Sequence, residues 1–393
     1  MTKYSSLVKW RKKLLSPVEG IEWASEMVLN PALIRDPDTG RFHMLVRTTG
    51  PWKQAQLPGK PLPFPIFFGY GWSDDGENFE FDLSRPALSP ALKFEKEEMY
   101  IKNGYGERVP NYANGCIEDP RLFFIDGVCY MTVATRMFPA GPYWDHDDPT
   151  QCMPEWARTE ENTFGTIESP SMSILYRVDL KALDAKDYDN AFCYMCHLND
   201  PAMGDDRDVF FFPKKMKIDG EDCYIMLQRP RDPSVYGFDS KLPSIVMAAA
   251  KEFRDFAAGK VLRRELLIKP SFDWQKERIG SSTPPIDLGN GEWLLNYHAK
   301  KNPAEGYGQS FMILEERENE LPVIKHICNE KMIVNEEEWE APAKFKMPVV
   351  FFTGLIEYDG DLLCGYGAAD QYVGLMRIDY PALLELLRRC DNK

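Results

Sequence analysis

The sequence predicts an all-β protein, a five-bladed β-propeller with short helices at its N- and C-termini. Apolar runs of strand-like length and composition recur along most of the chain and are separated by Gly-containing turns. One pattern, a strand, a tight turn and a return strand that ends in a polar residue, occurs five times at intervals of roughly 65–90 residues. Each interval holds about four strands, the content of one blade. A β-sandwich whose hairpins resemble each other by chance is the alternative.

The five hairpins are predicted from turn residues that separate two apolar runs. Asp126-Gly127 is the clearest turn, because a two-residue Asp-Gly step between apolar runs strongly indicates a hairpin. The paired runs are 30–34 with 42–46, 122–125 with 128–135, 208–213 with 224–228, 284–287 with 293–297, and 348–352 with 362–366. Further strands are predicted at 66–72, 172–178, 245–250 and 309–315.

Five blades account for the whole chain, so residues 1–393 are expected to form a single domain. Basic residues and an apolar stripe over 4–15 predict a short N-terminal helix within residues 1–20, and the segment after Pro381 predicts a C-terminal helix within 380–393. No segment of the sequence is predicted to be a linker that would divide the chain, so we expect no second domain.

Two long insertions, 51–65 and 138–171, follow hairpins on the side where Arg47 and Arg136 lie. Loops of this length in a compact domain are commonly functional, so both are predicted to form walls of a pocket. Trp144 and Trp156 in the second insertion would offer ring faces to a sugar. The alternative is an oligomer contact or a plain surface loop, which leaves a homo-oligomer open.

The chain is acidic, with a net charge of −14 and a pI of about 5.0. That balance argues against nucleic acid and anionic membranes as partners. The N-terminal residues lack the apolar core of a signal peptide, and no apolar run has the length of a membrane span. Nine cysteines scattered through strand-like segments fit reduced, buried thiols. We therefore expect a cytoplasmic protein.

One motif suggests a cofactor, and we expect none. Cys193, Cys196 and His197 match the C-x-x-C-H spacing of covalent haem attachment, but no export signal accompanies them. A zinc site would need a further ligand, and no second Cys pair follows. The expectation is therefore a protein without metal or bound cofactor.

The strongest candidate site residue is Asp119, in the corner Glu118-Asp119-Pro120-Arg121 at the mouth of the second hairpin. Pro120 cannot donate to a strand ladder, so the corner is predicted to be the beginning of a strand. A carboxylate at such a place is held by rigid scaffold yet open to a ligand. A local ion pair between Asp119 and Arg121 is the alternative.

Polar residues also stand at corresponding ends of the other hairpins. The inner strands of a propeller converge on its axis, so these side chains are expected to meet there. A single Arg at a strand end is usually a surface charge, and it is the recurrence in several hairpins that predicts a shared polar site. The set is Asn30, Arg47, Asp119, Arg207, Arg229, His298 and Asp370, with Tyr307 nearby.

Six segments, in this order, resemble glycoside hydrolase family 130, the β-mannoside phosphorylases and their hydrolytic relatives. They are NPALIRDPDTGRFHMLVR, SDDGENF, GCIEDPRLFFIDGVCY, RDVFFFPKKMKIDGEDCYIMLQRP, IGSSTPPIDLGNGEWLLNYH and VVFFTGLIEYDGDLLCGYGAAD. Together they span residues 30–370. The resemblance implies a five-bladed propeller with its site at the central depression.

The resemblance also implies roles for the polar residues. Asp119 is implied as general acid. The residues implied to hold the substrate are Asn30, Arg47, Glu118, Arg121 and Asp370, and those implied to bind phosphate are Arg207, Arg229, His298 and Tyr307. The sequence departs from the family pattern where Arg229 replaces an expected Lys, where Asp205, Asp206 and Asp208 surround Arg207, and in the length of 138–171.

We therefore expect inverting phosphorolysis of a β-mannoside oligosaccharide, with inorganic phosphate as co-substrate and α-mannose 1-phosphate as product. A phosphorylase needs an acid and a cluster of cationic donors, whereas an inverting hydrolase needs a second carboxylate to deprotonate water. An inverting β-mannosidase with Asp208 or Glu118 as base is the first alternative. A non-catalytic propeller that binds glycans is the second, and the acceptor sugar and linkage stay open.

Overall fold

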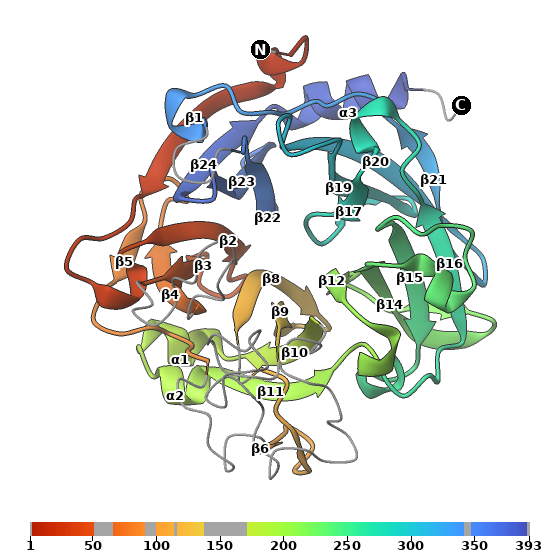
Figure 1. Cartoon of the computed structure of the whole chain (residues 1–393), viewed down its shortest axis with the longest axis horizontal. Coiled ribbons are helices and arrows are strands. Elements are labelled where there is room, and N and C mark those ends of the chain that lie inside the picture. Colours follow the sequence, from red (N-terminus) through yellow and green to blue (C-terminus); the bar gives the residue numbers. More distant parts are fainter. Residues whose placement is uncertain are drawn as a thin grey trace, which may run out of the picture.

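The computed structural model describes residues 2–50, 66–90, 100–113, 116–136, 171–341 and 347–390. Five antiparallel sheets stand as blades around a common axis (Figure 1), which confirms the predicted propeller. In each of these sheets the first strand in the sequence lies at the axis and the later strands follow it outward. The exception is the sheet in which the two ends of the chain meet. The predicted hairpins and the four further strands are all present.

Blade 1 consists of β2 (Met27–Arg35), β3 (Phe42–Thr49), β4 (Ile66–Ser73) and β5 (Glu80–Asp82). Blade 2 consists of β8 (Ile117–Ile125), β9 (Val128–Thr135), β10 (Met172–Val178) and β11 (Phe192–His197). Blade 3 consists of β12 (Asp206–Phe211), β14 (Glu221–Pro230), β15 (Ile245–Ala250) and β16 (Arg263–Ile268), with β13 (Met216–Ile218) beside β14.

Blade 4 consists of β17 (Arg278–Ser281), β19 (Glu292–Lys300), β20 (Tyr307–Arg317) and β21 (Glu320–Ile327), with β18 (Ile286–Gly289) beside β19. Blade 5 consists of β22 (Val350–Tyr358), β23 (Asp361–Ala368), β24 (Tyr372–Ile378) and β1 (Val8–Leu15). The innermost strands are therefore β2, β8, β12, β17 and β22, and they surround the axis in Figure 1.

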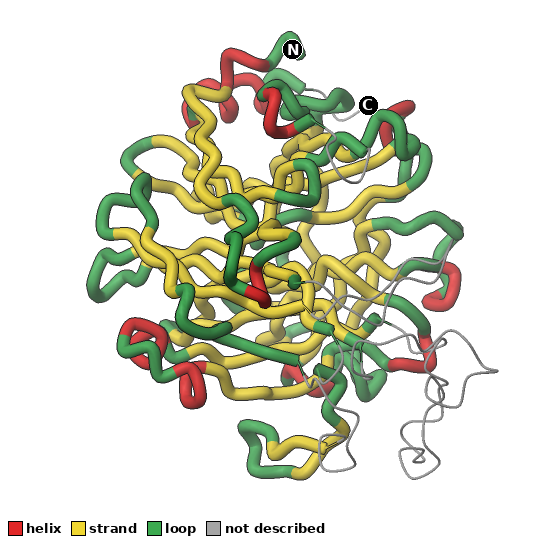
Figure 2. The backbone as a smooth tube through the Cα atoms, turned by 60° about the vertical axis from the view of Figure 1, so that its left-hand side comes forward, coloured by secondary structure: helices red, strands yellow, loops and turns green. Residues whose placement is uncertain are grey.

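The remaining elements are short. The α-helices are α1 (Leu180–Asp184), α2 (Tyr188–Ala191) and α3 (Tyr380–Arg388), and the 3-10 turns are Ser5–Leu7, Glu22–Ala24, Pro201–Met203, Pro233–Tyr236, Phe253–Asp255, Asp273–Gln275 and Glu338–Glu340. Strands β6 (Tyr100–Lys102) and β7 (Arg108–Pro110) form a separate hairpin that projects from the body, at the bottom of Figures 1 and 2.

The prediction of an N-terminal helix is wrong, because residues 8–15 form β1. This strand pairs antiparallel with β24, with Arg11 opposite Met376, and completes the outer edge of blade 5. The edge of β24 carries backbone N–H and C=O groups that need partners, and pairing with β1 supplies them. The predicted C-terminal helix is confirmed as α3, whose first turn is capped by Asp379 Oδ1, 3.0 Å from the amide nitrogen of Ala382.

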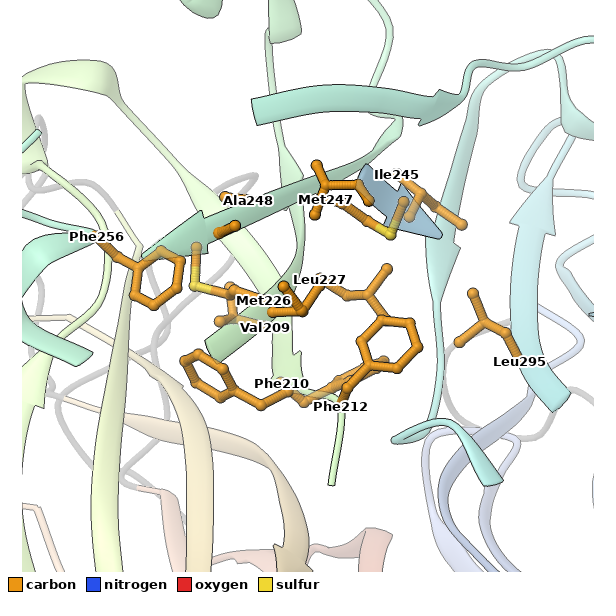
Figure 3. Close-up of a cluster of buried hydrophobic side chains, with 14 of the residues drawn as sticks. Val209, Phe210, Phe212, Met226, Leu227, Ile245, Met247, Ala248, Phe256 and Leu295 are labelled. Carbon is orange, nitrogen blue, oxygen red and sulfur yellow. The ribbon is translucent and has the colours of Figure 1, made fainter. Parts of the chain in front are cut away.

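The buried hydrophobic side chains of the described residues form four clusters, each of which includes residues of at least two blades. One cluster of buried side chains runs through blades 2, 3 and 4, and Figure 3 shows part of it around β12, β14 and β15, with Leu295 of β19 beside them. Phe212 meets Trp293 edge-on, with ring centroids 5.2 Å apart, and so joins blade 3 to blade 4. This packing fixes how neighbouring blades are placed, and with them the polar ends of the inner strands.

Candidate active site

Three of the innermost strands are interrupted near the axis by a residue in the left-handed backbone conformation. Asn30 has φ 45° in β2, Asp119 has φ 52° in β8 and Asp208 has φ 53° in β12. At each of them the pairing register with the next strand shifts. Such bulges turn a side chain away from the regular pleat, and Asn and Asp tolerate this conformation better than most residues. The same local device thus places a polar side chain at the axis in blades 1, 2 and 3.

Asp119 is held by side chains of blade 1. Asn30 Nδ2 donates to Asp119 Oδ1 at 2.7 Å, and Arg47 Nη1 donates to the same oxygen at 2.8 Å. Both contacts use Oδ1, and the Asp119 side chain is 14% exposed. Arg121 Nη1 donates to the backbone oxygen of Asp119, so the carboxylate itself pairs with Arg47 and not with its neighbour in the chain.

Glu118 lies between two arginines from different blades. Arg207 Nη1 is 2.9 Å and Arg47 Nη1 is 3.4 Å from Glu118 Oε2. Burial would raise the pKa of Glu118, but Arg207, Arg47 and Arg136 outweigh it and lower that pKa to about 2. Arg207 is fixed from its other side by Ser171 Oγ, which accepts from Nη2 at 3.0 Å and from Nε at 3.2 Å.

Asp208 is the centre of a second, deeper group of charges. Its carboxylate contacts Arg229 Nε, lies 3.5 Å from Arg121 Nη2 and lies 3.3 Å from His298 Nε2. Burial opposes ionisation of this carboxyl, but Arg229, His298 and Arg121 outweigh it and hold the pKa of Asp208 well below its ordinary value. The side chain is 3% exposed, so Asp208 is a buried anion shared by three partners.

A chain of hydrogen bonds fixes His298 behind Asp208. Ser282 Oγ lies 3.0 Å from His298 Nδ1 and 2.9 Å from Gln309 Oε1, and Gln309 Nε2 donates to the backbone oxygen of Val350. Burial lowers the pKa of His298, although Asp208 partly offsets the effect. His298 is 0% exposed and Arg121 is 2% exposed. In this arrangement both support Asp208, and their contact with substrate or phosphate stays a prediction.

Blade 4 lines the site with a set of charged and aromatic side chains. Glu277 Oε1 accepts from Arg278 Nη2 at 2.7 Å and pairs with Lys300 Nζ at 2.8 Å. Tyr307 joins them, since its hydroxyl is 3.5 Å from Arg278 Nη1 and its ring lies beneath Lys300 Nζ at 5.3 Å. The His298 and Tyr307 ring centroids are 5.6 Å apart, which ties this group to Asp208.

Asp370 differs from the other site carboxylates. It follows β23 in the left-handed conformation, with φ 52°. Within the part of the chain that the structure describes, Glu118, Asp119 and Asp208 each make an ion pair and Asp370 makes none. Burial raises the pKa of Asp370 to about 6, with Asp119 adding to the rise and Arg47 and Lys300 opposing it.

Two glycines make room for this arrangement. A Cβ on Gly280 of β17 would lie 2.6 Å from both Arg229 Cδ and Asp208 Oδ2. A Cβ on Gly367 of β23 would lie 1.9 Å from Asn30 Oδ1. Strand backbones therefore pack directly against Asp208 and Asn30, which only residues without a side chain allow.

A cavity of about 410 Å³ opens beside these groups. Five of the side chains around it are cationic, and two are carboxylates. The lining comprises Asp205, Arg207, Arg229, Arg231, Lys241, Pro243, Glu277 and Arg278. A polar, positively charged hollow of this size suits an anion with several oxygen acceptors.

The structure brings the predicted site residues together around one end of the axis, by way of the contacts given above. The walls predicted from the insertions 51–65 and 138–171 lie outside the described residues, apart from Ser171. Sequence reasoning missed Ser171, Glu277, Arg278, Ser282 and Lys300. Arg278 and Lys300 could have been found as charged residues at the ends of blade 4 strands, had β17 been recognised.

The C-x-x-C-H segment forms part of β11, the outer strand of blade 2. Among the described residues, no three His, Cys, Asp or Glu side chains are grouped so that they could hold a metal ion. No helix within the described ranges has the length and apolar character needed to cross a membrane.

A family model described as beta-1,4-mannooligosaccharide phosphorylase matches residues 109–389. The chain belongs to glycoside hydrolase family 130. This family-130 enzyme is 26% identical over 367 residues to a 1,2-beta-oligomannan phosphorylase of Thermoanaerobacter sp. (strain X514), an alignment that covers 93% of this chain and 94% of the relative.

Solved structures share the fold of the family-130 enzyme. The beta-1,2-mannobiose phosphorylase from Listeria innocua, solved with beta-1,2-mannobiose, superposes with a TM-score of 0.61 at 16% identity and 98% coverage of both chains. A structure from work on family-130 glycoside hydrolases that target beta-1,2 mannosidic linkages in Candida mannan gives a TM-score of 0.61 at 15% identity, covering 97% and 96% of the two chains. The family of mannoside phosphorylases therefore also includes hydrolases.

Proposed function

We propose that this family-130 enzyme is an inverting phosphorylase that cleaves a β-mannoside with inorganic phosphate and releases α-mannose 1-phosphate. The observation that carries the proposal is the cation-lined cavity next to the Asp119 cluster. Arg207 lines this cavity and also donates to Glu118, the neighbour of Asp119 in the chain, at 2.9 Å. A phosphate seated at Arg207 and Arg229 would thus lie close to a sugar held at Asp119.

The state of the carboxylates also favours phosphorolysis. An inverting hydrolase needs a carboxylate that can take a proton from water. Glu118 has a pKa of about 2 and is paired with two arginines, and Asp208 is buried among Arg121, Arg229 and His298. Both are poor proton acceptors near neutral pH, so neither suits the role of base that hydrolysis would give them.

In the proposed reaction a phosphate oxygen attacks C1 of the mannosyl unit from the face opposite the leaving oxygen. The C1–O bond to the acceptor breaks, the new C1–O–P bond forms, and Asp119 supplies the proton that the leaving oxygen requires, either directly or through a substrate hydroxyl. Asn30, Arg47 and Asp370 would hold the ring. Arg207, Arg229 and Tyr307 would bind and orient the phosphate, whose negative charge the two arginines offset.

We propose a β-1,2-linked mannoside as the substrate. Two curated relatives, a 1,2-beta-oligomannan phosphorylase and a beta-1,2-mannobiose phosphorylase, each align with at least 93% of this chain. The family description names β-1,4-linked mannooligosaccharides, so both linkages belong in the test. A cytoplasmic location is proposed as well, because eight cysteines in the described ranges are free thiols.

The test is to incubate the enzyme with β-1,2- and β-1,4-mannobiose, with and without phosphate, and to measure mannose 1-phosphate and free mannose separately. We expect turnover to depend on phosphate, to saturate with it and to yield one mannose 1-phosphate and one mannose per disaccharide. Asp119→Asn serves as the inactive control. Steady release of two mannose molecules per disaccharide, unaffected by phosphate, would contradict phosphorolysis.

One observation supports hydrolysis as a second candidate. Asp370 makes no ion pair with any described residue and has a pKa of about 6, so it could accept a proton from water. If free mannose forms without phosphate, Asp370→Asn should abolish that activity. If phosphorolysis is observed, the same variant should mainly weaken binding of the sugar.

A further inference from the structure

The cavity beside Arg207 and Arg229 contains more positive charge than one phosphate contact requires. Its cations form a series of increasing exposure: the side chain of Arg229 is 9% exposed, Arg207 and Arg278 are each 31% exposed, and Arg231 is 79% exposed. Lys241, which is also exposed, stands in the same lining. The charges therefore run from the interior of the site to the solvent.

The inner and outer cations differ in how they are paired. Arg229 contacts the buried carboxylate of Asp208, and Arg207 contacts the carboxylate of Glu118, which is 13% exposed. Arg231 has a looser partner in Asp205, at 3.4 Å, and Lys241 makes no ion pair or hydrogen bond with any residue in the described ranges. Much of the free positive charge of the cavity thus lies at its mouth.

The loop that carries the outer cations is held in place. Arg231 and Lys241 flank the connection from β14 to β15, in which Asp232 accepts from the amide nitrogen of Ser234 at 2.9 Å and from its hydroxyl at 2.6 Å. The Arg231 amide donates to the backbone oxygen of Asp205 at 2.9 Å. Ser244 Oγ closes the far end of the loop by donating to Leu242 O at 2.6 Å. The backbone from which both cationic side chains extend is therefore fixed beside the cavity.

A positively charged mouth matters because the protein as a whole has a net charge of −14. A dianion approaching such a protein is repelled unless local cations reverse the field, and clefts lined by one sign of charge can raise association rates by about 10- to 1,000-fold. Neutral mannosides feel no such repulsion. The two substrates of a phosphorylase would therefore respond differently to the outer charges.

We propose that Arg231 and Lys241 form an electrostatic guide that collects phosphate groups and passes them along Arg278 to Arg207 and Arg229. The guide acts on inorganic phosphate in the direction of cleavage and on mannose 1-phosphate in the direction of synthesis. Neither outer residue needs to touch the reacting atoms. This inference rests on the proposed phosphorolysis and adds to it the residues that set the capture of the anionic substrate.

The experiment is a comparison of Arg231→Glu/Lys241→Glu with a matched double variant, Lys217→Glu/Lys260→Glu. Lys217 and Lys260 are exposed and lie towards the other end of the blade 3 strands, away from the cavity. Each double variant replaces two cations with two carboxylates, so both change the net charge equally. Steady-state rates are measured against phosphate, mannose 1-phosphate and neutral mannobiose. Measurements at about 0.01 M and about 1 M ionic strength correspond to Debye lengths of about 30 Å and about 3 Å.

We expect the Arg231/Lys241 variant to lose about tenfold or more in kcat/KM for both phosphate compounds at low salt. Its kcat at saturating phosphate and its kcat/KM for mannobiose should match wild type, and high salt should remove most of the difference. Arg231→Gln/Lys241→Gln should give an intermediate loss, which guards against a folding defect caused by the new carboxylates.

Two results would overturn the guide while leaving phosphorolysis intact: an unchanged kcat/KM for phosphate, or an equal loss in the Lys217/Lys260 control. A wild-type enzyme whose turnover does not depend on phosphate would instead refute the proposed function, and the guide with it. The wild-type enzyme provides an independent test. If the outer cations guide phosphate, added salt should lower kcat/KM for phosphate and leave kcat/KM for mannobiose unchanged.

Discussion

Arg47 Nη1 lies 2.8 Å from Asp119 Oδ1, so a side chain of blade 1 holds the carboxylate that blade 2 presents at the axis. The same nitrogen is 3.4 Å from Glu118 Oε2, and one guanidinium therefore spans two neighbouring carboxylates. A charge-assisted hydrogen bond of this kind fixes the orientation of the carboxylate as well as offsetting its charge. The position of the proposed acid thus depends on how two blades pack against each other.

The first prediction concerns that acid. Asp119→Asn should lower kcat by about 10²- to 10⁴-fold, the usual contribution of a general acid or base. The fold should survive, because Asn accepts the left-handed conformation that Asp119 has and its amide oxygen can still accept from Arg47. The measurement is kcat in both directions together with the thermal midpoint.

A matched control is Asp126→Asn, which changes an Asp with the same φ of 52° at the β8–β9 turn, at the opposite end of the hairpin from the site. It should keep wild-type kcat. Retention of more than half the wild-type activity by the Asp119 variant would exclude Asp119 as the acid.

The second prediction concerns Gly280. A Cβ there would come within 2.6 Å of Arg229 and of Asp208, so Gly280→Ala should push this pair out of place. We expect KM for phosphate to rise at least tenfold, with a much smaller change in KM for the mannoside. Gly308→Ala, in β20 of the same blade, is the control, because its Cβ would meet only the flexible chain of Lys331. Equal kinetics in the two variants would refute this role of the glycine.

The third prediction concerns the buried anion. Asp208→Asn removes the charge that offsets Arg121 and Arg229 while keeping the shape of the side chain, so it should lower the free energy of unfolding by roughly 3–5 kcal/mol. Denaturation with urea, followed by intrinsic fluorescence, measures the loss. Asp239→Asn, which removes the charged partner of Lys269 in a solvent-exposed pair, should leave the stability unchanged. A wild-type midpoint for the Asp208 variant would show that its charge is not needed for folding.

The fourth prediction concerns pH. Burial raises the pKa of Asp206 to about 7, against an ordinary value of 3.8, although Arg229 and Arg264 oppose the rise. Below about pH 4 this carboxyl is protonated in both the folded and the unfolded chain. Between about pH 4 and 7 the unfolded chain releases the proton and the folded chain keeps it, so stability falls across that window by a contribution on the order of 4 kcal/mol.

Asp206→Asn should remove that contribution, since an amide oxygen can still accept from the Arg229 amide nitrogen, which lies 3.1 Å from Asp206 Oδ1. The difference in unfolding free energy between variant and wild type is measured from pH 4 to 8. It should move in favour of the variant as pH rises to 7 and stay constant above it. A difference that does not change with pH would contradict a raised pKa at Asp206.

Much of the fold could be predicted because the hairpin turns are local. Asp126-Gly127 and Asp359-Gly360 both place an Asp and a Gly at positive φ, the conformation that a tight hairpin turn needs. An Asp-Gly step between apolar runs predicts this turn from the sequence alone. The general location of the site followed from the recurrence of polar residues at the inner ends of these hairpins. Both signals lie within a few residues of the feature that they predict.

The rest depends on contacts between distant parts of the chain. Strand β17 shows no apolar alternation, because Ile279 alone enters the hydrophobic core and Gly280 packs against Asp208 and Arg229. Blade 4 was therefore predicted without its innermost strand. Likewise, no pattern within residues 4–15 indicates that this segment pairs as a strand with the edge of β24, more than 350 residues later.

The pairing of β1 with β24 has a consequence for how the enzyme is made. A ribosome synthesises β1, the outer strand of blade 5, near the beginning of the chain and β22, β23 and β24 near its end. Blades 1 to 4 are each continuous in the sequence. All strands of blades 1 to 4 have therefore been synthesised before blade 5 can be completed. Val8–Leu15 must meanwhile stay unpaired with its eventual partner. Asp370, too, is synthesised only with that last part of the chain, so a nascent chain that ends before blade 5 lacks one of the polar side chains predicted for the site.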